Sequence, residues 1–108
     1  MKLLLINPPK WNAPVAEYDR AVYGNIGAKP PLQLLFLAGY LYKELPDVII
    51  QILDAQAIGL TNEETVKKVV DFCPDVVGIS SFTEFWYDTD ILIRGIRNAL
   101  PKTHITLG

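Results

Sequence analysis

The stretch QILDAQAIGLTNEE, residues 51–64, leads from an apolar run into a helical pattern. The run over residues 48–53 is rich in isoleucine and leucine without strict alternation, which is typical of a strand covered on both faces. Further on, Thr61 and Glu64 have the spacing of a capping box, which predicts the start of a helix. The stretch therefore predicts a strand that passes through a short polar connection into a helix.

This strand and helix pattern recurs along the chain. Comparable apolar runs occupy residues 2–6, 48–53, 76–80 and 105–107. Helical patterns lie between them, over residues 30–45, 61–73 and 88–100. Because crossovers between parallel strands are right-handed, the order predicts an α/β fold, a flavodoxin-like (Rossmann-like) doubly wound parallel sheet in three αβα layers. Ligands of such sheets bind beyond the carboxyl ends of the strands.

Apolar spacing also predicts which side of each helix is buried. In the second helix the expected buried stripe is Val66, Val69, Val70 and Cys73, so Cys73 is expected to be a small buried hydrophobic residue. In the third helix the stripe is Leu92, Ile93, Ile96 and Leu100. The first helix is apolar nearly all round. One of its stripes is Leu32, Leu35, Phe36 and Gly39, and the other is Leu34, Leu37, Ala38, Leu41 and Leu45. It either packs deeply on its own sheet or also meets another domain, which Gly39 would allow to approach closely.

Composition excludes several classes of function. The 108 residues fit one small domain, and half of them are apolar. Ten basic and twelve acidic residues, without long runs of either sign, do not indicate a nucleic-acid partner. No apolar run is long enough to span a bilayer and no secretory signal is recognisable, so we expect a cytoplasmic protein without a membrane partner. The single cysteine allows neither an intrachain disulfide nor a thiolate metal site.

The residues that follow the expected strands narrow the choice of ligand. The first strand leads into NPPKWNAPV, and GNIGAK at residues 24–29 matches neither dinucleotide nor triphosphate motifs. Asn7 stands where a phospho-receiver would need an acidic cluster for magnesium. The second strand instead ends in the pattern D-x-Q-x-x-G, formed by Asp54, Gln56 and Gly59, and the third ends in Ser80, Ser81 and Thr83.

These motifs carry a resemblance to a known family. DAQAIG resembles the cobalamin-binding motif D-x-H-x-x-G with Gln56 in the histidine position, and Ser80 with Phe82 matches its S-x-L. The terminal ITLG ends at the first glycine of the family's G-G pair, Gly108. Together with MKLLLINPP and KPPLQLLFLAGYL, the whole chain, residues 1–108, resembles the N-terminal B12-binding domain of cobalamin-dependent radical SAM enzymes. Phe82 replaces a leucine, the second glycine is missing and no C-x-x-x-C-x-x-C motif is present.

The resemblance implies that the chain binds cobalamin and performs no bond chemistry itself. Gln56 cannot coordinate cobalt as the family's histidine does, so the resemblance implies base-off cobalamin without a histidine ligand, and Asp54 becomes free to cap loop amides. Gly59 would let the backbone approach the cofactor, Ser80 would offer a hydroxyl to the nucleotide tail, and Gly108 would line the tail slot. The remaining candidates for cofactor contact are Asn7, Ser81 and Phe82, and no metal ligand or catalytic residue is expected.

The same resemblance implies a larger parent enzyme, a methyltransferase or cyclase that uses a [4Fe-4S] cluster and S-adenosylmethionine. Its radical SAM domain would lie beyond residue 108 and would be the partner of this domain. We therefore expect a C-terminally truncated fold that retains cobalamin poorly and self-associates. The alternative is a noncatalytic interaction or sensor domain of the same fold that has lost the cofactor.

Several residues keep more than one interpretation. Residues 54–59 also fit an ordinary loop with an Asx turn and a glycine at positive φ, and Ser80 and Ser81 also fit capping roles. The aromatic run Phe85, Trp86 and Tyr87 either covers the corrin or packs on the next helix. His104 lies at the amino end of its strand, too far from the ligand edge to bind cobalt. The long segment over residues 7–29 is either functional or disordered.

Overall fold

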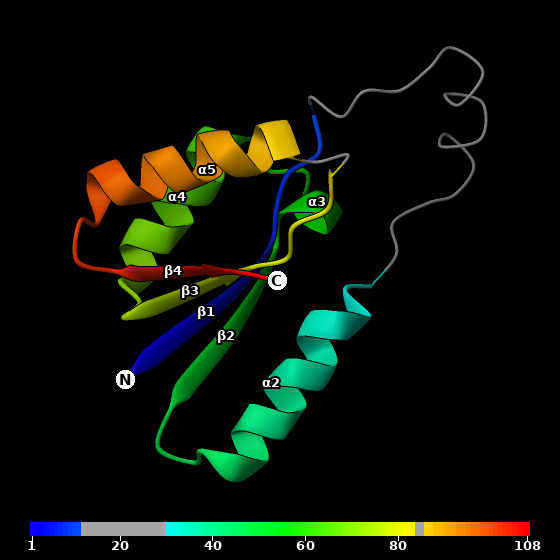
Figure 1. The fold of residues 1–108 in the computed structure, drawn as a ribbon, viewed down its shortest axis with the longest axis vertical. Helices are drawn as coiled ribbons and strands as arrows, with labels where there is room; N and C mark the ends of the chain where they lie inside the picture. Colours follow the sequence, from blue (N-terminus) through cyan, green and yellow to red (C-terminus); the bar gives the residue numbers. More distant parts are fainter. Residues whose placement is uncertain (12–29, 84–85) are drawn as a thin grey trace.

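The computed structural model describes residues 1–11, 30–83 and 86–108. Within these residues it contains a parallel sheet of four strands in the order β2-β1-β3-β4 (Figure 1). The strands are β1 (Lys2–Asn7), β2 (Ile49–Asp54), β3 (Val76–Ile79) and β4 (His104–Leu107). The helices are α2 (Leu32–Glu44), α3 (Ala55–Ile58), α4 (Asn62–Phe72) and α5 (Trp86–Ala99). This arrangement confirms the predicted flavodoxin-like αβα fold, with every predicted strand within one residue of its bounds.

The register of the sheet brings the strand ends together at one edge. β1 lies between β2 and β3, and Asn7 pairs with Asp54 at the carboxyl end of the β1–β2 ladder. On the other side of β1, Ile6 pairs with Ile79, and the amide of Ser80 continues this ladder by donating to the Ile6 carbonyl at 3.0 Å. Because all four strands are parallel, the polar residues that follow β1, β2 and β3 gather at this edge.

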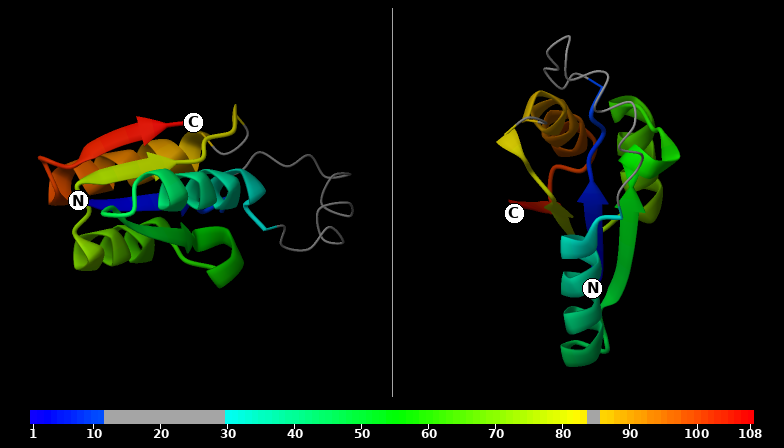
Figure 2. Two further views of the ribbon diagram at one scale, coloured as in Figure 1. Left: turned by 90° about the horizontal axis from the view of Figure 1, so that it is seen from below. Right: turned by 90° about the vertical axis from the view of Figure 1, so that its right-hand side faces the viewer.

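The helices lie on both faces of the sheet. Figure 1 shows α4 and α5 together on one side and α2 on the other, and the right-hand view of Figure 2 shows α2 standing alone along the sheet. The core lies under α4 and α5, and is formed by buried residues of the sheet and both helices, including Leu4, Ile6, Val69, Val77, Leu92 and Ile96. Within the described residues, no helix combines the length and apolar character needed to cross a membrane.

The α4–α5 layer is closely packed. Thr61 Oγ1 accepts a hydrogen bond from the Glu64 amide at 3.1 Å, and the Glu64 carboxylate accepts one from the Thr61 amide, which confirms the capping box at the start of α4. Gly95 lets the two helices approach, because a Cβ at this position would lie 2.7 Å from Val66 Cγ2. The predicted buried stripe of α5 is confirmed, since Leu92 and Ile96 are fully buried and Ile93 and Leu100 pack on the core.

The predicted buried stripe of α4 is partly wrong. Cys73 is exposed, because it caps the helix in the left-handed conformation at φ 52° and so leaves the helical spiral after Phe72. Val70 is also exposed, whereas Thr65 and Val69 are buried and Phe72 packs against the core. The buried side of α4 is therefore rotated toward Thr65 and Phe72 relative to the prediction.

The prediction that α2 packs deeply on its own sheet is wrong as well. Only Leu34 of this helix is buried, while Phe36 and Tyr40 on the outward side are 76% and 64% exposed. A Cβ added at Gly39 would meet no atom within 4 Å, so this glycine serves no close approach among the described residues. The remaining interpretation, that the outward side of α2 meets another domain, stays a prediction.

Candidate functional site

The connection after β2 is a single helical turn, α3, that the sequence did not predict. Asp54 caps it by accepting a hydrogen bond from the Ala57 amide at 3.1 Å. Gly59 ends the turn at φ 77°, a backbone conformation that residues other than glycine rarely adopt. The expected capping by Asp54 and the expected positive φ of Gly59 are both confirmed. These local roles agree with the ordinary-loop interpretation and with a ligand site equally well.

Asn7 joins the two polar residues of this connection into one hydrogen-bonded group. Its Nδ2 donates to Asp54 Oδ1 at 2.9 Å, and its Oδ1 accepts from Gln56 Nε2 at 3.3 Å. Asn7 is buried, whereas Asp54 and Gln56 are half-buried. We call this group, Asn7 with Asp54 and Gln56, the polar corner. It stands at the carboxyl ends of β1 and β2, where ligands of this fold class bind.

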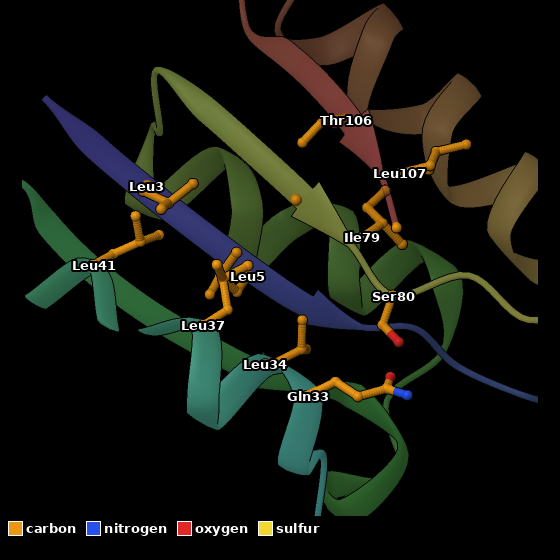
Figure 3. Close-up of a pocket in the computed structure, with 12 residues that line it drawn as sticks. Leu3, Leu5, Gln33, Leu34, Leu37, Leu41, Ile79, Ser80, Thr106 and Leu107 are labelled. Carbon is orange, nitrogen blue, oxygen red and sulfur yellow. The ribbon is translucent and has the colours of Figure 1, made fainter. Parts of the chain in front are cut away.

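A second feature is an apolar groove between α2 and the face of the sheet, which reaches the carboxyl ends of the strands at Ser80 and Gly108. Its volume is about 340 Å³, within the roughly 300–1,000 Å³ of small-molecule sites. In Figure 3 leucines of β1 and α2 face one another across the groove, and Ser80 and Gln33 lie at one end of it. The groove is lined by Leu3, Leu5, Gln33, Leu34, Leu37, Leu41, Gly78, Ile79, Ser80, Thr106, Leu107 and Gly108. Two predicted site residues, Ser80 and Gly108, therefore belong to it.

Two further residues of the groove were missed by the sequence analysis. A Cβ at Gly78 would lie 2.9 Å from Leu5 Cδ2 and 3.8 Å from Thr106 Cγ2, so the absence of a side chain at Gly78 makes room for Leu5 against the sheet. A glycine inside an apolar strand is a recognised signal of close approach and could have identified it. Gln33 is the polar residue in the otherwise apolar first turns of α2, and this contrast could have identified Gln33 as well.

The other predicted residues lie near the groove without lining it. The Ser81 amide donates to the Gly108 carbonyl at 2.7 Å, and the Gly108 amide donates to the Ile79 carbonyl at 3.1 Å, so backbone pairing continues beyond β3 and β4. Phe82 is 42% exposed and is not among the residues of the groove. The structure therefore places Asn7, Asp54 and Gln56 in one group, Ser80 and Gly108 in another, and Gly59, Ser81 and Phe82 in neither.

The remaining candidates can be placed only in part. His104 is exposed at the first residue of β4, which confirms its position at the amino end. Trp86 and Tyr87 begin α5 with at least half of their surface exposed, so neither is packed into the core. Phe85 and residues 12–29 lie outside the described residues. Trp11 follows the carboxyl end of β1, and its Nε1 donates to the Leu60 carbonyl at 2.8 Å.

Comparison with known proteins identifies a relative that matches the whole chain. The chain is 33% identical over all 108 residues to a protein of Pyrococcus horikoshii named as an uncharacterized methyltransferase. The chain spans about a fifth of the length of this relative, 21%. No protein-family model matches the chain, and no solved structure matches it. The chain is thus similar to one part of a methyltransferase-related protein.

Proposed function

We propose that this chain is a cobalamin-binding domain of a methyltransferase-related protein and holds cobalamin base-off, without histidine on cobalt. The observation that carries the proposal is the apolar groove under α2, together with the polar corner at the carboxyl ends of β1 and β2. The similarity to a protein named as a methyltransferase supports the assignment to a methyltransferase-related protein. The order of D-x-Q-x-x-G, Ser80-x-Phe82 and Gly108 along the chain supports the choice of cofactor.

The residues fit the nucleotide tail of the cofactor. A flat aromatic base suits an apolar groove lined by leucines, to which Gly78 adds no side chain. Ser80 and Gln33 supply a hydroxyl and an amide at one end, where a polar sugar or phosphate would need hydrogen bonds. The groove would therefore hold the tail by apolar contact along its length and by polar contact at Ser80 and Gln33.

The residues of the polar corner would lie below the corrin. Bound cobalamin would supply methyl transfer, and this chain would bind and orient it. An amide oxygen is a poor ligand for cobalt compared with imidazole, so Gln56 would leave the lower face without a protein nitrogen. The finer assignment rests on the sequence resemblance. It makes the parent protein a radical SAM methyltransferase or cyclase, whose [4Fe-4S] cluster and S-adenosylmethionine would bind on a partner domain.

The groove can be tested by adding bulk inside it and outside it on one strand. Thr106 is exposed and lines the groove, whereas His104 lies two residues earlier on the same side of β4 and does not line it. Thr106→Trp should weaken hydroxocobalamin binding at least about tenfold, equivalent to about 1.4 kcal/mol, and His104→Trp should leave it unchanged. Binding is measured by titration of the visible spectrum with chain in excess.

A corrinoid without the nucleotide tail, cobinamide, serves as the second ligand. Its binding should be weaker than that of cobalamin in the wild type and should respond less to Thr106→Trp. Because one side of the groove is open, we expect bound cobalamin to dissociate during desalting, so affinity must be measured at equilibrium. Absence of saturable binding, or equal binding by the two tryptophan variants, would contradict the proposal.

The absence of a histidine ligand has its own test. The Co(II) form bound to the wild type should show no splitting from an axial nitrogen in electron paramagnetic resonance, whereas Gln56→His should gain this splitting. In the variant, Asn7 Oδ1 stands 3.3 Å from the present Gln56 Nε2 and can accept the ring N–H, which orients the other ring nitrogen. Axial nitrogen in the wild type would show that the lower face has been assigned wrongly.

A second candidate function follows from the outward side of α2. Its exposed Phe36, Tyr40 and Tyr42 favour a noncatalytic interaction domain of the same fold. This alternative predicts no saturable corrinoid binding in any variant, so the same titration separates the two functions.

A further inference from the structure

We infer that Asn7 is a positioning residue that fixes the orientation of the Gln56 side chain, and that Asp54 acts on the Gln56 side-chain amide through Asn7. The inference deepens the proposed function, on which its meaning for cobalamin rests. The side chain of Asn7, from a different strand, is hydrogen-bonded to both Asp54 and Gln56.

The direction of the hydrogen bonds in the polar corner follows from the Asp54 carboxylate. A carboxylate only accepts hydrogen bonds, so the atom of Asn7 that faces Asp54 must be the donor Nδ2, as observed at 2.9 Å. The other atom of the Asn7 amide is then the acceptor Oδ1. Its partner on Gln56 must be the donor Nε2, as observed at 3.3 Å. Asp54 therefore determines, through Asn7, which end of the Gln56 amide faces the sheet.

The consequence for the ligand side is chemical. The two polar atoms of a planar amide diverge, so holding Nε2 on Asn7 turns Oε1 away from Asn7. Gln56 then presents a hydrogen-bond acceptor. An acceptor suits a water molecule, which has protons to donate, and does not suit an acceptor-only group. The polar corner would thus favour water, over an anion, next to the lower face of the corrin.

Asparagine is the side chain that this position requires. Asn7 is only 7% exposed, so each of its polar atoms needs a protein partner. Aspartate would place a second carboxylate against Asp54 Oδ1. Leucine, of similar size, would remove both hydrogen bonds and leave Gln56 without its partner on β1. The matched control is Asn98→Leu, because Asn98 is exposed near the end of α5 and contacts no residue of the corner in the described structure.

The test has one readout that requires no ligand. In proton–nitrogen NMR of the chain, the Gln56 side-chain amide protons should exchange slowly with water. Asn7→Leu should return them to the exchange and shifts of an exposed glutamine, and Asn98→Leu should not change them. Unchanged Gln56 amide signals in Asn7→Leu would overturn the inference, because a merely structural role of Asn7 would not affect them.

A second readout uses cobinamide, which lacks the tail and therefore probes the corner rather than the groove. Asn7→Leu should weaken its binding about twofold to tenfold, the effect of one ordinary hydrogen bond, and Asn98→Leu should not. If the NMR change occurs but the wild type binds no corrinoid, the inferred hydrogen-bond chain stands and the proposed function fails. If the wild type binds cobinamide and Asn7→Leu binds it equally well, the inference fails.

A third variant covers the case in which Asn7→Leu does not fold. Gln56→Leu alters a half-buried residue and leaves the Asn7–Asp54 hydrogen bond in place. It removes the donor to Asn7 Oδ1, so the chemical shifts of the Asn7 side-chain amide should change, although its protons remain bonded to Asp54. Unchanged shifts of this amide would also overturn the inference.

Discussion

The two faces of β1 carry the same kind of side chain into different surroundings. Leu4 and Ile6 point toward α4 and α5 and belong to a closed core. Leu3 and Leu5, which alternate with them, line the groove beside α2. The apolar run alone does not distinguish the two faces, because both are leucine-rich. An apolar face of a sheet can therefore form a closed core where two helices cover it, as under α4 and α5. Where a single helix covers it, as under α2, the same kind of face can leave a groove for a ligand.

The largest expected effect compares leucines on the two faces. Leu4→Ala should lower the free energy of unfolding by about 2–5 kcal/mol, because Leu4 is 2% exposed and its removal leaves an enclosed cavity. Leu3→Ala should cost about 1 kcal/mol, because Leu3 is half-buried beside an open groove and only its transfer from water is lost. Urea unfolding followed by circular dichroism measures both. Equal losses would mean that the groove face is as closed as the core.

The next effect compares glycines in the helices that cover the two faces. Gly95→Ala should destabilise the chain by about 1–3 kcal/mol, because the new Cβ would lie 2.7 Å from Val66 Cγ2. Gly39→Ala should stabilise it by about 0.5–1 kcal/mol, because the position in α2 is open and alanine favours helix. The same unfolding measurement applies. A destabilising Gly39→Ala would reveal a close contact on the outward side of α2.

A last expected effect concerns association through α2. We expect the chain to self-associate, since Phe36 and its aromatic neighbours are exposed. Phe36→Lys should raise the dissociation constant about tenfold, or about 1.4 kcal/mol, in sedimentation over a concentration series. Val70→Lys on α4, where valine is 38% exposed, is the control and should have little effect. A wild type that remains monomeric at high concentration would remove the support for an interface on α2.

The elements that could be predicted are those that local sequence determines. Apolar runs identified the strands, and Thr61 with Glu64 identified the start of α4 because a capping box is complete within one turn. The buried side of α4 was predicted less well, since Cys73 leaves the helical spiral at a positive φ that has no sequence signal of the kind that glycine provides. The buried side of α2 could not be chosen, because a helix that is apolar nearly all round has no preferred stripe.

The candidate site shows the same limit. Ser80 and Gly108 were expected at a tail slot, and both line the groove. Asn7 was expected near the ligand, but its bonds to Asp54 and Gln56 join residues 47 and 49 positions apart. Such contacts depend on the register of β1 and β2, which no local pattern determines. The roles of all these residues toward cobalamin stay predictions.

The central position of β1 also has a consequence for how fast the chain folds. Each pairing of this strand joins distant parts of the chain, and the hydrogen bond from the Lys2 amide to Asp75 closes 73 residues. No strand of the described sheet pairs with its partner through a hairpin, so the entropy of large loops must be lost before the sheet gains stability. We therefore expect folding in milliseconds to seconds rather than microseconds. Helices α4 and α5, which contact each other within the second half of the chain, are the part able to form earlier.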